Sequence, residues 1–223
     1  MTITGFHHTG IVTRDLDGLA ARYAGLGFTV SPRSRHLLST APGEPPVPSC
    51  TANQCVYFEN AYIELLGIVD DTAPDPWHAR EMGTGFRILN FATPDAAALS
   101  FDGIPTSGVL DLERDVEDGG TLRARAVHLD PRSTPEGYIG VAQHLTREHT
   151  RAVEHPNGAR RLAAVRITAA DFDTTVDRYA RVLGVPPTPV FTVGDARLEI
   201  VPGPVSRLES MTVAGDGADL ELT

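Results

Sequence analysis

The sequence predicts an α+β chain built from repeated units, each of which contains a strand, a helix and further strands. Two observations indicate this fold class: the first thirty residues follow a strand-turn-helix pattern, and a similar pattern restarts near residue 161. The motifs Asp15-Leu16-Asp17 and Arg22-Tyr23-Ala24 return as Asp171-Phe172-Asp173 and Arg178-Tyr179-Ala180. Because duplicated units bury their sheets against one another, we expect a curled sheet whose concave face can hold a ligand.

The first unit shows the pattern most clearly. Residues 6–12 are β-branched, aromatic or small, which favours a strand. Asp15 offers a side-chain oxygen that can cap the helix that follows. Apolar residues recur at helical spacing from Leu16 to Tyr23, and Gly25 and Gly27 are expected to end the helix.

The later elements follow from hydrophobic runs that are separated by turn residues. We expect a proline-rich loop over residues 40–50 and three units, at residues 1–70, 84–146 and 159–223, the last of them partial, within one compact body. The expected strands are 54–58, 62–69, 86–92, 109–112, 122–129, 138–145, 162–168, 189–193, 197–201 and 208–213, and the further helices are 95–101 and 172–183.

Composition restricts the possible partners. The net charge of -10 and the pI near 5.2 argue against nucleic acid and anionic membranes, since both need a basic patch. No apolar run approaches the ~20 residues that span a bilayer, and the N-terminus does not resemble a signal peptide. Cys50 and Cys55 are expected to be free thiols of a cytoplasmic protein.

Several motifs resemble those of a known superfamily. They are His8-x-Gly10-Ile11-Val12-x-Arg14-Asp15-Leu16-Asp17, Tyr62-Ile63-Glu64-Leu65-Leu66, Gln143-His144 and His155-Pro156-Asn157-Gly158. With them, the chain resembles the vicinal oxygen chelate superfamily, whose members include glyoxalase I, methylmalonyl-CoA epimerase, extradiol dioxygenases and bleomycin-resistance proteins. Within it, the chain is most similar to the glyoxalase-like domain branch.

The resemblance implies both a fold and a class of function. The fold would be repeated βαβββ modules that form an open, curved mixed β-sheet barrel with helices packed outside. The function would be that of a metal-dependent lyase, isomerase or dioxygenase that acts on a small oxygenated substrate by polarising a carbonyl or enolate. Dimerisation is common in the superfamily, so a homodimer is expected.

The resemblance also implies site residues. His8, Glu64 and Gln143 match the positions of metal ligands, and such a donor set suits a divalent Zn, Fe, Mn or Ni ion. Gln143 and His144 point to opposite faces of their strand, and apolar neighbours on the face of Gln143 favour it for the interior. Tyr62, Asn53 and His144 are the candidate substrate-binding residues.

Glu64 is the candidate catalytic base. It lies on an apolar strand, where burial of an unpaired carboxylate raises its pKa, and a metal beside it would stabilise the enolate that forms when it takes a proton.

Departures from the superfamily pattern keep two alternatives open. Ile88 stands at the first-strand position of the second unit, and Ala164 stands there in the third, although Glu199 retains the carboxylate position. The missing ligand favours a metal-free protein that binds or sequesters a small molecule, such as an antibiotic. The varied third unit also permits a scaffold whose site has decayed.

Overall fold

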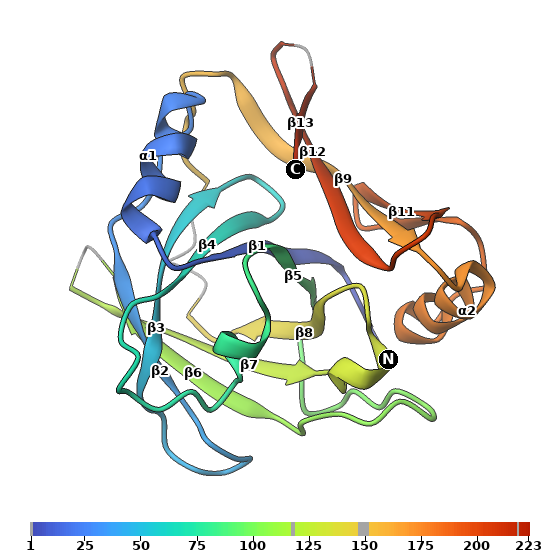
Figure 1. Cartoon of the computed structure of the whole chain (residues 1–223), viewed down its shortest axis with the longest axis horizontal. Helices are drawn as coiled ribbons and strands as arrows, with labels where there is room; N and C mark the ends of the chain where they lie inside the picture. The colour runs from blue at the N-terminus through green and yellow to red at the C-terminus, as the bar shows by residue number, and fades with distance from the viewer. Residues whose placement is uncertain (1, 117–118, 147–151, 218) are drawn as a thin grey trace.

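An eight-stranded barrel dominates the computed structural model, which describes residues 2–116, 119–146, 152–217 and 219–223. Its strand order is β1-β4-β3-β2-β6-β7-β8-β5, and the pairing of β2 with β6 closes it (Figure 1). The expected barrel was an open one. The strands are β1 (Gly5–Thr13), β2 (Ser34–Leu38), β3 (Val47–Tyr57), β4 (Tyr62–Ile68), β5 (Gly85–Ala92), β6 (Leu110–Asp115), β7 (Thr121–His128) and β8 (Tyr138–His144).

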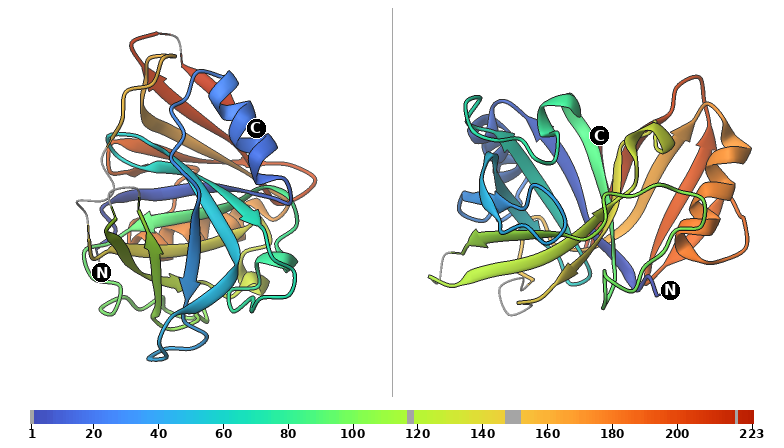
Figure 2. Two further views of the ribbon diagram at one scale, coloured as in Figure 1. Left: turned by 90° about the vertical axis from the view of Figure 1, so that its left-hand side faces the viewer. Right: turned by 90° about the horizontal axis from the view of Figure 1, so that it is seen from below.

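A second sheet lies beside the barrel, with the order β10-β11-β9-β12-β13 (Figure 2, orange and red). None of the helices in the described ranges is long and apolar enough to cross a membrane. The strands are β9 (Ala159–Ala169), β10 (Val190–Val193), β11 (Ala196–Pro202), β12 (Arg207–Gly215) and β13 (Leu220–Leu222). The helices are α1 (Leu16–Gly25), α2 (Phe172–Leu183) and the 3-10 turns η1 (Ala79–Glu81) and η2 (Pro131–Ser133).

The strand pairings repeat along the chain, which confirms the predicted α+β class. β1 pairs in parallel with β4, β5 with β8, and β9 with β11. The first strands pair antiparallel with their neighbours, β1 with β5 and β9 with β12. Both α-helices begin as expected, because Asp15 accepts a hydrogen bond from Gly18 N and Asp171 accepts one from Thr174 N.

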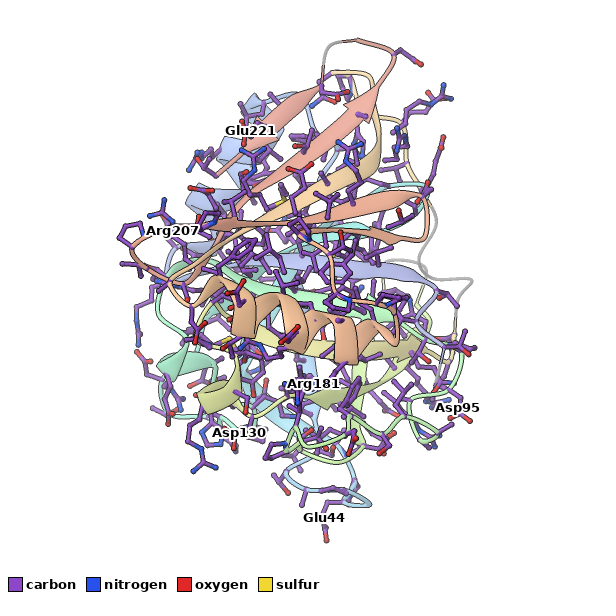
Figure 3. All side chains as sticks on the ribbon, turned by 90° about the vertical axis from the view of Figure 1, so that its right-hand side faces the viewer. Glu44, Asp95, Asp130, Arg181, Arg207 and Glu221 are labelled. Atoms are coloured by element: carbon purple, nitrogen blue, oxygen red, sulfur yellow. The ribbon has the colours of Figure 1, made fainter. Side chains whose placement is uncertain are left out.

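The main apolar core lies outside the barrel, between its wall and the second sheet. Phe6, Phe91 and Ile139 belong to one buried cluster with Met211 of the second sheet. Helix α2 lies across the junction between barrel and second sheet (Figure 3), and its Tyr179 ring packs 6.2 Å from the Phe91 ring. The outward-facing residues of β1, β5 and β8 are therefore buried by the second sheet together with helix α2.

Residues 95–101 do not form the predicted helix. The side chains of Asp95 and Gln143 instead accept hydrogen bonds from the backbone N–H groups of Ala97 and Ala96, at 3.0 Å each. These donors are the groups that a helix start would leave unpaired, so side chains satisfy them without a helix. Strands β2 and β13 were not predicted. The sequence pattern did not reveal β2, because its inward face carries the polar residues Ser34 and His36 in place of an apolar pair.

A buried ion pair joins the second sheet's helix to the barrel. Glu136, in the loop before β8, is fully buried and accepts hydrogen bonds from Arg178 Nη2 and Tyr179 Oη of α2, both at 2.8 Å. Burying two charges is costly unless each is paired, so removing one partner leaves an uncompensated charge in the interior. This contact therefore holds α2 in one position against the barrel.

We expect Arg178→Met to lower the free energy of unfolding by about 3–5 kcal/mol, because it leaves the buried Glu136 carboxylate without its cationic partner. Urea unfolding measures the loss. The control is Arg207→Met, which removes an exposed partner of Glu209 at 3.1 Å and should cost less than about 1 kcal/mol. Equal losses in the two variants would show that the buried pair does not hold α2.

Candidate functional site

The barrel encloses a cavity of about 70 Å³. Inward-facing residues of all eight strands form its wall, and apolar side chains, including Val12, Leu66, Ile88 and Met82, gather at one end. The middle of the wall is polar. Its hydrogen-bonding and charged side chains include His8, His36, Asn53, Glu64, Asn90, Arg114, His128 and His144. An enclosed space with convergent polar groups is typical of a small-molecule site.

Glu64 of β4 is the buried carboxylate of this cavity and is 7% exposed. Asn53 Nδ2 donates to its Oε1 at 2.8 Å. The Nε2 atoms of His8 and His36 lie 3.6 Å from Oε2 and Oε1, respectively. Burial raises the pKa of Glu64, and this effect exceeds the opposing effects of the Asn53 hydrogen bond and the Arg114 charge.

The two imidazoles beside Glu64 are neutral near pH 7. Burial lowers the pKa of His8 and of His36 to about 3 each, and the positive charge of Arg114 adds to the shift. His36 Nδ1 lies 3.0 Å from Thr51 Oγ1, which fixes the ring and aims Nε2 at the cavity. His8 Nε2 lies 3.0 Å from the Asn90 amide nitrogen.

Four buried polar atoms on the cavity wall have no hydrogen-bond partner among the described residues. They are His36 Nε2, Asn53 Oδ1, Asn90 Oδ1 and His128 Nδ1. Buried polar atoms of folded proteins are normally paired, so such a cluster around one cavity indicates a place for a polar ligand. The ligand that fits best is one with several oxygen atoms or N–H groups.

The structure brings most of the predicted site residues to the cavity but not Gln143. His8, Glu64, Asn53, Tyr62 and His144 all line it. The Gln143 side chain instead accepts from Ala96 N at 3.0 Å and donates to Pro94 O at 2.6 Å, on the outer side of β8. Its proposed role as a metal ligand is therefore wrong in this geometry.

The apolar neighbours of Gln143 on β8 explain why it was wrongly assigned to the interior. Ile139 and Val141 share its face of β8, and both belong to the core between the barrel and the second sheet. An apolar face on this strand therefore marks the packing side, and His144 lies on the cavity side.

The polar cavity residues that were missed in the sequence include Asn90, His36, Arg114 and His128. The register places Asn90 rather than Ile88 opposite His8, because β1 contains irregularities on both sides of this pair. Counting along the strand cannot detect such a shift. His36 and Arg114 pair with each other across β2 and β6. A signal was available for Arg114 alone, because Leu110 and Leu112 alternate with acidic residues and place Arg114 on their face of β6.

The donor set does not fit the predicted three-ligand metal site. Of the predicted ligands, only His8 and Glu64 face the cavity. Within the ranges that the structure describes, no group of three or more His, Cys, Asp or Glu side chains is arranged to hold a metal ion. The Asn90 amide also lies against His8 Nε2, the nitrogen that would have to bind the metal.

A larger outer pocket, of about 660 Å³, adjoins one end of the cavity. Met82, His128 and Tyr138 line both spaces. The His128 ring packs 4.7 Å from the Trp77 ring and 4.9 Å from the Tyr138 ring, measured between centroids. His128 and Tyr138 therefore stand where the outer pocket meets the polar interior, and the Trp77 ring packs against His128 on the cavity wall.

Comparisons with known proteins agree with the fold. A family described as "Glyoxalase-like domain" matches residues 6–183. A hypothetical protein from Staphylococcus aureus superposes with a TM-score of 0.68 at 15% identity, over 97% of each chain. No curated protein matches the sequence.

Two methylmalonyl-CoA epimerases superpose with lower TM-scores. The Streptomyces coelicolor enzyme in complex with 2-nitronate-propionyl-CoA is 20% identical over 65% of this chain and 99% of that chain, with a TM-score of 0.43. The Mycobacterium tuberculosis enzyme is 17% identical over 63% and 88%, with a TM-score of 0.42.

We expect acid to destabilise the protein through its buried histidines. The pKa of His36 is about 3 in the folded chain and near 6.5 in the unfolded chain. The stabilisation of the folded state that comes from keeping His36 neutral is therefore complete above pH 6.5 and is lost as the pH falls toward 3. Between pH 7 and pH 5 this amounts to about 2 kcal/mol. Urea unfolding at both pH values should show that His36→Gln loses about 2 kcal/mol less stability between pH 7 and pH 5 than the wild type does. The exposed control His78→Gln should lose as much as the wild type.

Proposed function

Because the chain belongs to the glyoxalase-like domain family of the vicinal oxygen chelate superfamily, we propose that it is an enzyme that acts on a small oxygenated molecule. Its reaction removes a proton from a carbon beside a carbonyl group and returns a proton to form an isomer or release a leaving group. The observation that carries this proposal is Glu64, a buried carboxylate with a raised pKa between two neutral imidazoles.

Glu64 suits the role of the base. Its raised pKa makes the carboxylate a stronger proton acceptor than an exposed one, and Asn53 holds Oε1 in place. The substrate proton passes to the carboxylate, and the C–H bonding electrons move toward the carbonyl oxygen as an enolate forms. Glu64 then carries the proton that the second half of the reaction returns.

The enolate needs a hydrogen-bond donor, and the cavity wall supplies a candidate. The Asn90 amide is buried and faces the same cavity as Glu64. A donor that is fixed in place before the reaction, in a site that excludes water, stabilises developing charge far more than a donor in water does. This group would take the part that the superfamily resemblance assigned to a divalent metal. No step of this proposal passes through a metal, since the described donors do not form a three-ligand group.

The second candidate is a protein that binds a small molecule without reaction. The aromatic rings of Trp77, His128 and Tyr138 on the cavity wall favour it, because aromatic walls can retain a flat ligand. This candidate predicts binding with a fixed stoichiometry and no change in the ligand. Proton exchange at carbon separates the two candidates, since only the enzyme would catalyse it.

We expect the protein to catalyse exchange of deuterium from D₂O into the carbon beside the carbonyl of small carbonyl compounds, followed by proton NMR. Glu64→Gln should lower the exchange rate by at least about 100-fold, since the amide cannot accept the proton. The matched control is Glu199→Gln, because Glu199 holds the corresponding position on β11 but pairs with Arg166 outside the cavity.

Unchanged exchange in Glu64→Gln would refute the role of the base. Binding of carbonyl compounds by the wild-type chain without any exchange would instead support the second candidate.

We expect catalysis to survive removal of divalent metal. Dialysis against a chelator, checked by elemental analysis, should leave the exchange rate within about twofold of its starting value, since His8 and Glu64 form no three-ligand group with another described side chain. Loss of exchange on dialysis, with recovery on adding Zn²⁺, Mn²⁺, Fe²⁺ or Ni²⁺, would restore the metal-dependent hypothesis.

A further inference from the structure

Arg114 is a buried cation that the reaction described above does not use. It lies on β6, is 4% exposed and lines the barrel cavity. Arg125 also lines the cavity, but its guanidinium turns outward to Asp111 at 3.2 Å and its side chain is 42% exposed. Arg114 therefore brings a permanent positive charge into the interior, because a guanidinium does not lose its proton in proteins.

The two buried arginines, Arg178 and Arg114, differ in whether a carboxylate pairs with them. Arg178 has a carboxylate partner, Glu136, at 2.8 Å. No carboxylate of the described residues lies within 4.0 Å of the Arg114 guanidinium, and its hydrogen-bond acceptor is the hydroxyl of Tyr57, at 2.5 Å. Burial raises the pKa of Tyr57, so this hydroxyl stays neutral and does not balance the charge. A buried cation without a counter-ion is costly, which makes an anionic ligand the natural partner.

His36 stands beside Arg114 and adds a second polar group for such a ligand. The two residues are paired across β2 and β6, and His36 Nε2 is a buried atom without a hydrogen-bond partner among the described residues. When Thr51 donates to Nδ1, the proton of the neutral ring lies on Nε2, which then becomes a donor facing the cavity. Arg114 and His36 together present donors to two oxygen atoms of one group.

Among the residues that the structure describes, Glu64 carries the only carboxylate on the cavity wall. Its carboxylate lies within 3.6 Å of both His36 and His8, and not within ion-pair distance of Arg114. In the barrel order β4-β3-β2-β6, the strand of His36 lies between that of Glu64 and that of Arg114. An anion bound at Arg114 would thus be separated from Glu64 along the wall. The remainder of the ligand would then extend toward the carboxylate.

We propose that the ligand of this cavity is a small organic carboxylate, whose carboxylate group is bound by Arg114 and His36 and whose reacting carbon faces Glu64. The assignment of the reacting carbon rests on the proposed function, and the assignment of the carboxylate does not. A guanidinium matches the planar, two-oxygen geometry of a carboxylate. The cavity volume of about 70 Å³ limits the inner part of the ligand to a few non-hydrogen atoms.

The test compares pyruvate with pyruvamide, which have almost the same shape and differ in charge. Isothermal titration calorimetry of the wild-type chain should show that pyruvate binds at least tenfold more tightly. Arg114→Gln should abolish the preference, and Arg114→Lys, which keeps the charge but not the fork of donors, should retain a weaker one. The control Arg125→Gln should retain the full preference.

Equal binding of the acid and the amide by the wild-type chain would overturn the proposal, and so would a full preference in Arg114→Gln. Binding of neither compound would overturn it as well. The wild-type comparison and Arg114→Lys keep the proposal open to refutation if Arg114→Gln does not fold, which circular dichroism would detect.

Repeating the titration in Glu64→Gln separates this proposal from the proposed function. Preference for pyruvate in that variant, together with absence of deuterium exchange in the wild-type chain, would support the carboxylate site and reject the base. Deuterium exchange into pyruvamide as fast as into pyruvate, with equal binding, would support the base and reject the carboxylate site.

Discussion

The packing of the barrel wall against the second sheet is the interaction on which the rest of the structure depends. Phe6, Phe91 and Ile139 point out of the barrel into the core that Met211 and Tyr179 complete. Because apolar burial is satisfied on this outer side, the inner side of the same strands is free to carry histidines, amides and charges. A barrel with solvent on its outside would have to bury more of its apolar side chains in the interior, which would leave less of the wall for polar groups.

The interior environment then determines the chemistry of the site. Water is largely excluded, so His8 and His36 remain neutral and the pKa of Glu64 rises. The positive charge of Arg114 acts across the same poorly screened space. The strand register fixes these groups relative to one another, as the pairing of His36 with Arg114 shows. The arrangement is therefore prepared before any ligand arrives, which lowers the free-energy cost of ordering it on binding.

Repeats and local spacing in the sequence were sufficient for the fold class and for both α-helices, and the superfamily resemblance was sufficient for the cavity positions of His8 and Glu64. The sequence was insufficient on β8, where both faces of the strand are largely buried. On β8 the apolar face packs against another sheet, so the choice of Gln143 over His144 for the interior was wrong. Asn90 was missed because a register irregularity in β1 is a tertiary feature that no single strand reveals.

Closure of the barrel by β2 and β6 also decides how selectivity can arise. An open sheet can spread its edges to admit a wider molecule, whereas a closed ring of hydrogen-bonded strands cannot widen without breaking a ladder. Molecules must therefore pass one of the two ends of the ring, either beside His128 and Tyr138 or beside Tyr62 and His144, where outer pockets adjoin the cavity. The closed backbone thus sets a fixed upper limit on the width of a molecule that reaches the interior, and the side chains inside the ring reduce that width further.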